Sequence, residues 1–145
     1  FEVLRVLFYI YAFFVIFGVF TNLLIVVATI RSRSLRGTCN VLIAICSFLD
    51  ALHISGHIPM LWGYFSGDLF INSIFCLHLM VVPLLGLLGG SIMMLSIAFD
   101  RLLSCFAPQY YKNKDARLYI GMHVVVVLAY GSLQLNFAFQ HIKER

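Results

Sequence analysis

Charged residues are scarce in this sequence. Of its 145 residues only 11% are Asp, Glu, Lys or Arg, whereas 62% are hydrophobic. A soluble domain carries about 25% charged and about 45–50% apolar residues, so this chain has too few polar side chains to cover a water-exposed surface. Because disorder needs low hydrophobicity and high net charge, the same composition excludes an unfolded chain. We therefore expect an integral membrane protein.

Long charge-free windows divide the chain. Three windows without Asp, Glu, Lys or Arg each exceed the roughly 20 apolar residues that a transmembrane helix needs. A fourth stretch is apolar apart from one acid, Asp50, and two histidines. Because a membrane β-barrel would show shorter, alternating segments, the sequence predicts an all-α transmembrane domain with four spanning helices. The expected spans are residues 6–30, 38–64, 71–106 and 118–140 of a single domain covering 1–145.

Basic residues mark the expected cytoplasmic side. The first and third connections contain Arg31, Arg33, Arg36, Arg101, Lys112, Lys114 and Arg117. The second connection contains Asp68 and no Lys or Arg, so the positive-inside rule predicts that the N-terminus lies outside. These loops account for the net charge of +4, and no nucleic-acid partner is expected. We see no signal peptide at the N-terminus. Because the chain has no initiator Met and starts on Phe1 within an apolar pattern, we expect a fragment of a longer protein.

Asp50 is the clearest polar residue inside a predicted span. It lies about twelve residues into the span, or roughly 18 Å at 1.5 Å per residue, near the bilayer centre. His53 and His57 follow at i+3 and i+7, so the three side chains share one stripe of the helix. Asn22 is at a comparable depth on the first span and could hydrogen-bond Asp50. The group is either polar contact between helices or a centre that binds an ion or water and rearranges during function.

The third span carries polar residues at both ends. Cys76 and Arg101 are 25 residues apart, roughly 37 Å along a helix, which places one at each membrane surface. Cys76 then faces the oxidising side, and it is either a free thiol or bonded to a cysteine outside this chain. Asp100 and Arg101 alone would fit a charge pair at a helix end. Gly86 and Gly90 are spaced for close packing of helices.

The spacing of these residues across three spans resembles that of the first four helices of a rhodopsin-like G-protein-coupled receptor. The first span has Asn22 in GVFTNLLIV, and the second has Asn40 ten residues before Asp50 in NVLIAICSFLD. In the third span Cys76 precedes Arg101 by 25 residues. The end of that span, DRLLSCFAPQYY, is most similar to the nematode serpentine chemoreceptors.

The resemblance implies a receptor of seven helices, of which this chain holds the first four. The protein would lie in the plasma membrane, would transmit a chemosensory or neuropeptide signal to a heterotrimeric G protein, and would be no enzyme. Asp100 would hold Arg101 in the resting state, and the released Arg101 would meet the G protein. Pro108 and Tyr111, eight and eleven residues past Asp100, would shape the loop on which the G protein docks.

The resemblance also assigns roles nearer the outer side. Cys76 would form a disulfide with a cysteine of the second extracellular loop, beyond the sequence given. Asp50 and Asn22 would form the central polar network, where a sodium ion could bind, and no other cofactor is implied. Pro83 stands where amine receptors have an Asp, which disfavours a monoamine. The wall of an apolar pocket for an apolar or peptide-like ligand would consist of Pro83, Leu84, Leu87 and Leu88.

Two other classes of protein compete with this interpretation. His53, His57 and His78 could ligate a metal ion or haem in a membrane protein of four helices. That alternative leaves Arg101, Pro108 and the spacing across three spans unexplained. A tetraspanin-like scaffold would need a large, cysteine-rich outer loop, whereas the outer connection here is short.

Overall fold

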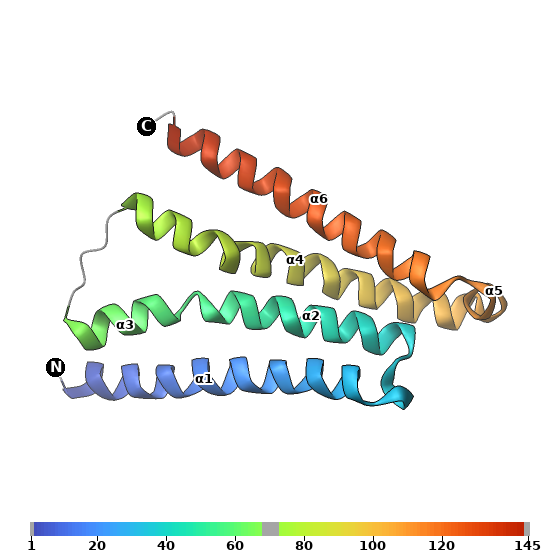
Figure 1. Cartoon of the computed structure of the whole chain (residues 1–145), viewed down its shortest axis with the longest axis horizontal. Helices are drawn as coiled ribbons and strands as arrows, with labels where there is room; N and C mark the ends of the chain where they lie inside the picture. Colours follow the sequence, from blue (N-terminus) through green and yellow to red (C-terminus); the bar gives the residue numbers. More distant parts are fainter. Residues whose placement is uncertain (1, 68–72, 144–145) are drawn as a thin grey trace.

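The structure, a computed structural model, describes residues 2–67 and 73–143 (Figure 1). These residues form helices joined by short turns, so the predicted all-α class is confirmed. The helices are α1 (Glu2–Arg31), η1 (Arg33–Leu35), α2 (Thr38–Ser55), α3 (Ile58–Ser66), α4 (Ser73–Phe106), α5 (Pro108–Asn113) and α6 (Ala116–Lys143). Asp68, the acid of the expected outer connection, lies outside the described residues.

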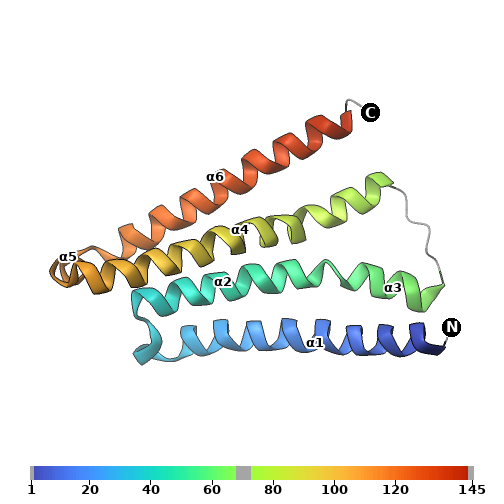
Figure 2. The same cartoon turned by 180° about the vertical axis from the view of Figure 1, so that it is seen from behind.

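The long helices lie side by side in a fan. α1 packs against α2, α2 packs most extensively against α4, and α4 packs against α6. Figures 1 and 2 show that α4 and α6 meet close to α5 and diverge toward the C-terminus. The two termini lie at the end of the bundle opposite α5. We call the end that contains η1 and α5 the α5 end.

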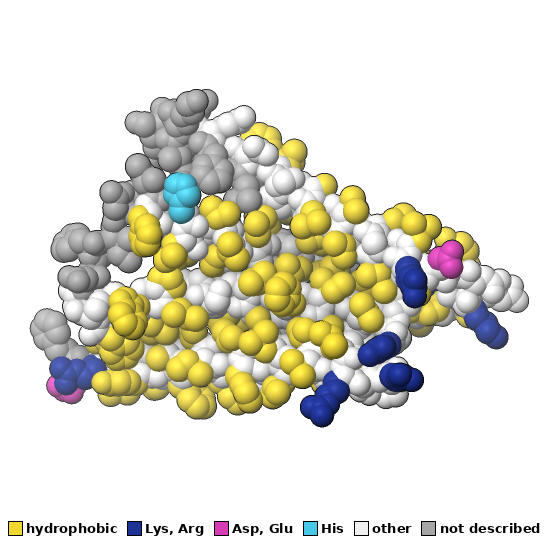
Figure 3. Space-filling model, in the orientation of Figure 1, with side chains coloured by type: hydrophobic (Ala, Val, Ile, Leu, Met, Phe, Trp, Pro, Cys, Tyr) yellow, Lys and Arg dark blue, Asp and Glu magenta, His cyan; other side chains and the backbone are white. Residues whose placement is uncertain are grey.

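Four helical segments are long and apolar enough to cross a membrane, as the sequence predicted. They are Glu2–Arg31, Thr38–Ser66, His78–Phe106 and Ala116–Gln134. Figure 3 shows hydrophobic side chains along the helices, with Lys and Arg gathered at the α5 end and one charged pair near the N-terminus. Such apolar surface suits a lipid environment, where a helix bonds most of its backbone groups within its own segment.

The second span is two helices rather than one. α2 ends at Ser55, and α3 begins at Ile58 with Pro59 in its first turn. Proline lacks an N–H, so Pro59 cannot bond to the Ser55 carbonyl and the α-helical ladder is interrupted there. The chain turns at Gly56, whose backbone N–H donates to the His53 carbonyl at 3.0 Å. The single helix expected over 38–64 is therefore interrupted, although both halves continue in one direction (Figure 1).

Glycines allow α4 to approach α2 closely. A Cβ added to Gly86 would lie 2.5 Å from the backbone oxygen of Leu49, and one added to Gly90 would lie 2.9 Å from Asp50 Oδ1. Neither position has room for a side chain without movement of its neighbour. The spacing of these two glycines therefore serves close helix packing.

The short helix α5 lies in the second basic connection, where the sequence had indicated only a loop. Pro108 is its first residue, a position where the fixed φ of proline suits a helix and its missing N–H is not needed. The Tyr111 N–H donates to the Ala107 carbonyl at 2.9 Å. This turn brings residues that follow α4 back toward its C-terminal end.

Candidate functional site at the α5 end

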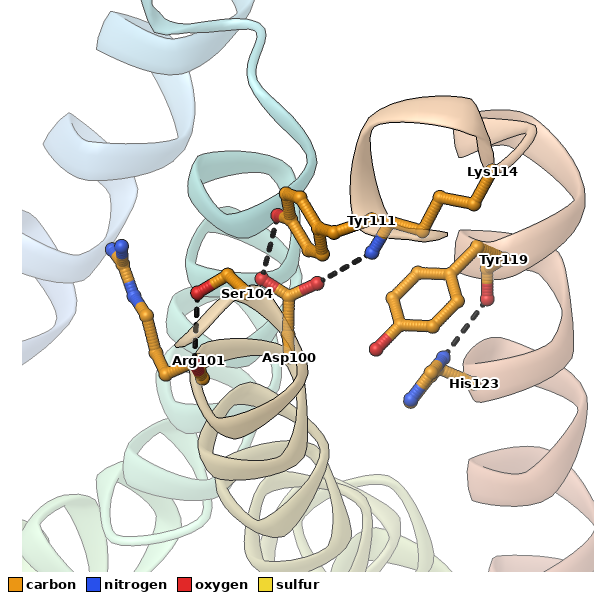
Figure 4. A network of polar contacts seen from close by, with 7 residues as sticks. All are labelled: Asp100, Arg101, Ser104, Tyr111, Lys114, Tyr119 and His123. Carbon is orange, nitrogen blue, oxygen red and sulfur yellow. Dashed lines mark hydrogen bonds and ion pairs between the residues drawn. The ribbon is translucent and has the colours of Figure 1, made fainter. Parts of the chain in front are cut away.

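Asp100 is the most deeply buried polar residue of the described chain, with a relative exposure of 0%. It lies in α4, two turns before the helix ends at Phe106. A carboxylate is rarely buried to this extent unless it is paired. The partners of Asp100 therefore define the site (Figure 4).

Both carboxylate oxygens of Asp100 have partners from the segment that follows α4. Lys114 Nζ lies 2.8 Å from Oδ1, and the Tyr111 hydroxyl donates to Oδ2 at 3.0 Å. The Lys114 and Asp100 side chains are only 6% and 1% exposed, so this is a buried ion pair. Tyr111 belongs to α5 and Lys114 is the residue that caps its C-terminal end. The carboxylate thus fastens this connection to α4.

Aromatic rings complete the surroundings of the lysine. Lys114 Nζ lies 3.7 Å from the ring centroid of Tyr111 and 3.4 Å from that of Tyr119, which belongs to the second turn of α6. An ammonium over the face of a tyrosine ring is attracted by the ring quadrupole. His123 follows one turn later, and its Nδ1 lies 2.9 Å from the Tyr119 carbonyl oxygen. The site therefore joins α4, α5 and α6.

The electrostatics of the site keep Tyr111 protonated. Burial of the phenol, followed by its hydrogen bond to Asp100 and the charge of that carboxylate, raises the pKa of Tyr111 above its ordinary value. The hydroxyl therefore remains a hydrogen-bond donor at neutral pH. Asp100 accepts from the Lys114 ammonium and the Tyr111 phenol at once.

Arg101 lies beside this site but is not part of its ion pair. Its side chain is exposed and extends away from the connection that holds Asp100 (Figure 4). Within residues 2–67 and 73–143, the ion pairs are Lys114 with Asp100 and Arg5 with Glu2. The resemblance implied that Asp100 holds Arg101, whereas in this structure Asp100 is paired with Lys114. The difference follows from α5 and the residue after it, which bring Tyr111 and Lys114 to the carboxylate.

Lys114 and Tyr119 are the site residues that sequence reasoning missed. Lys114 was counted only as a charge of a basic connection, fourteen residues beyond Asp100. Pro108 and Tyr111 were singled out, and the structure gives each a local position: Pro108 starts α5, and Tyr111 follows on the same short helix. No local pattern of the sequence separates Lys114 from the other basic residues of this connection.

The second predicted centre, around Asp50, is looser. Asp50 is half-buried, and its Oδ2 accepts a long hydrogen bond from the Cys46 thiol, with Sγ 3.9 Å away. Asn22 Nδ2 donates to the Gly18 carbonyl of its own helix at 2.9 Å, so the hydrogen bond expected between Asn22 and Asp50 is not formed. The His53 and His57 rings contact each other edge to face with centroids 5.6 Å apart. The sodium ion expected beside Asp50 stays a prediction.

The residues expected on the outer half of α4 are spread along the helix. Pro83 is buried, and a Cβ added to Gly56 would lie 2.5 Å from Pro83 Cβ, so this proline packs against the interruption between α2 and α3. Leu84 and Leu87 are 39% and 44% exposed, and Leu88 is half-buried. A cavity of about 420 Å³ lies elsewhere, between α1 and α2, with Arg36 on its lining. Whether the residues around Pro83 form a ligand pocket stays a prediction.

Metal ligation by the histidines has no support from the described residues. Among them no group of three or more His, Cys, Asp and Glu side chains is placed to hold a metal ion.

Cys76 is half-buried and forms no disulfide within this part of the chain. Its disulfide to another segment stays a prediction.

Comparison with known proteins identifies the family. The sequence matches the description "Serpentine type 7TM GPCR chemoreceptor Srsx" over residues 15–145. No curated protein and no solved structure is significantly similar to the chain. The match includes the Asp100 site and covers most of the described helices. The chain belongs to the Srsx family of serpentine seven-transmembrane G-protein-coupled chemoreceptors.

Proposed function

We propose that this chain transmits an extracellular chemical signal across the plasma membrane to a heterotrimeric G protein that docks at the α5 end. The observation that best supports this proposal is the arrangement of Asp100 and Arg101. A buried, fully paired Asp100 holds α5 in place, while the neighbouring Arg101 is exposed and available to a cytoplasmic partner. Membership of a family of chemoreceptors supports the receptor role.

The proposed orientation puts the α5 end in the cytoplasm and the N-terminus outside. Arg31, Arg33 and Arg36 lie at or near η1, and Lys112 lies in α5. Both segments are at the α5 end, where Lys and Arg gather (Figure 3). Basic residues are concentrated in cytoplasmic connections because they are poorly translocated. An anionic inner leaflet would attract the same end.

We propose roles for the other predicted residues in the same orientation. Asp50 and Asn22 belong to a central polar network that changes its contacts on activation and takes up a sodium ion. Cys76 forms a disulfide with a cysteine of the second extracellular loop. The apolar wall made by Pro83 and the neighbouring leucines of α4 favours an apolar or peptide-like ligand. Signalling then requires a change of shape biased by ligand binding, and no catalytic step.

Nucleotide exchange in the full-length gene product tests the proposal. Replacing Arg101→Ala should abolish GTPγS uptake by a panel of purified heterotrimeric G proteins while leaving surface expression largely intact. Arg33→Ala is the matched control, because Arg33 is also exposed at the α5 end but lies in η1. Undiminished exchange by the Arg101→Ala receptor would remove its assigned role.

A further inference from the structure

Each oxygen of the Asp100 carboxylate accepts a hydrogen bond from a donor other than Arg101. Oδ1 is taken by Lys114 at 2.8 Å and Oδ2 by Tyr111 at 3.0 Å, and the side chain is 1% exposed. A carboxylate can accept further hydrogen bonds, but Lys114 already places a buried positive charge beside Asp100. We propose that Lys114 is the counterion of Asp100, and that it keeps Arg101 free for the cytoplasmic partner. This inference rests on the proposed function for the role of Arg101, but not for the pairing itself.

The surroundings of Lys114 are those of a built site rather than of a chance surface contact. Its side chain is 6% exposed, its ammonium donates to Asp100, and two tyrosine rings lie within 3.7 Å of Nζ. A lysine gives up strong hydration when it is buried, so this position is stable only with its partners in place. Lys112, on α5 itself, is exposed. The two lysines of this connection therefore have different roles.

The pairing has a mechanical consequence. Asp100 belongs to α4, Tyr111 to α5 and Tyr119 to α6, and Lys114 contacts all three side chains or their rings. The ion pair therefore fixes the short helix against two spanning helices. Because Arg101 is the next residue of α4, the position of α5 relative to Arg101 is set by the same contacts.

Loss of Lys114 should change the partner of Asp100. A buried carboxylate left without its cation is costly, and the nearest remaining arginine along the chain is Arg101. Arg101 would then turn toward Asp100 and be withdrawn from the cytoplasmic partner. The expected sign is a loss of coupling on removing Lys114. If Asp100 restrained Arg101 instead, removing Lys114 would not reduce coupling, and Asp100→Asn would raise it.

Two double-mutant cycles on the purified full-length receptor test the pairing without any G protein. Thermal stability is measured for Asp100→Asn, Lys114→Gln and Arg101→Gln, and for the two double variants that contain Asp100→Asn. We expect the loss in the Asp100→Asn/Lys114→Gln variant to be smaller than the sum of the single losses, and the Asp100→Asn/Arg101→Gln cycle to be additive. Coupling only in the second cycle would overturn the inference.

Basal GTPγS uptake tests the consequence. Lys114→Gln should lower exchange about tenfold, and Asp100→Asn/Lys114→Gln should restore it toward the parent receptor. Arg5→Gln should leave exchange unchanged, because Arg5 is exposed near the N-terminus, at the end of the bundle opposite α5. Lys114→Arg is included because it keeps a cation if the Gln variant is poorly expressed. If Arg101→Ala leaves exchange intact, the proposed function fails. If Arg101→Ala abolishes exchange but Lys114→Gln has no effect, the inference about Lys114 fails.

Discussion

Two acids break the apolar spans of this chain, and their surroundings differ. Asp100 is fully buried, and each of its oxygens has a strong donor. Asp50 is half-buried and accepts a long hydrogen bond from the Cys46 thiol, with Sγ 3.9 Å away. The partners of Asp100 lie eleven and fourteen residues further along the chain, so four helices suffice to complete that site.

The contrast separates two uses of a carboxylate in a membrane helix. An acid whose hydrogen-bond and ion-pair partners come from its own chain, such as Asp100, fixes the position of nearby helices. An acid that the described helices leave partly unsatisfied, as they leave Asp50, is available to an ion, to water or to another segment. This difference makes Asp100 a structural anchor and Asp50 the better candidate for change during signalling.

The largest difference in stability between the two acids should appear when the cation that pairs with Asp100 is removed. Lys114→Met leaves the Asp100 carboxylate buried and unpaired, so we expect the free energy of unfolding to fall by about 3 kcal/mol. Asp50→Asn removes a poorly compensated charge and should leave stability unchanged or slightly higher. Reversible unfolding of the full-length protein in mixed detergent micelles measures both. Equal losses would show that the two acids are equivalent.

The sequence singled out Asp100 and Asp50 as acids within or at the end of apolar spans but could not rank them. Spacing along a helix predicts which residues share a face, and the four spans follow from hydropathy alone. The partner of Asp100 depends instead on how α5 folds back after Phe106. Pro108 signals that helix start, yet the final direction of the Lys114 side chain depends on burial against Tyr119. Such tertiary contacts are not encoded by a local pattern.

Close backbone packing, rather than an ion pair, holds the region around Asp50. Gly86→Ala would place a Cβ 2.5 Å from the Leu49 backbone oxygen and 2.7 Å from the His53 nitrogen. Since backbone atoms must then move, we expect a loss of about 2 kcal/mol in the free energy of unfolding. Gly121→Ala is the control, because nothing lies within 4 Å of its added Cβ. Equal unfolding curves for both variants would contradict the close approach of α2 and α4.

A smaller effect should follow from removing one hydrogen bond to Asp100. Tyr111→Phe keeps the ring that contacts Lys114 but leaves Oδ2 without its donor, so stability should fall by about 1.5 kcal/mol. Tyr110→Phe is the matched control, since Tyr110 is 65% exposed. The same unfolding measurement applies. A loss as large as that of Lys114→Met would mean that the phenol, not the ammonium, is the main partner of Asp100.

The smallest expected effect is on the pH dependence of stability. The pKa of Tyr111 is raised in the folded protein by burial and then by the Asp100 contacts. The folded state therefore binds the phenolic proton more tightly than the unfolded state, and this contribution is complete below the unfolded pKa of about 10. It is lost as the pH rises through the higher folded pKa. Unfolding measured from neutral pH into this alkaline range should thus show a steeper loss for the parent protein than for Tyr111→Phe. Asp50→Asn is the control, because no tyrosine is among the partners of Asp50 that the structure records. This variant should retain the slope of the parent protein. Identical slopes for all three proteins would contradict the contact between Tyr111 and Asp100.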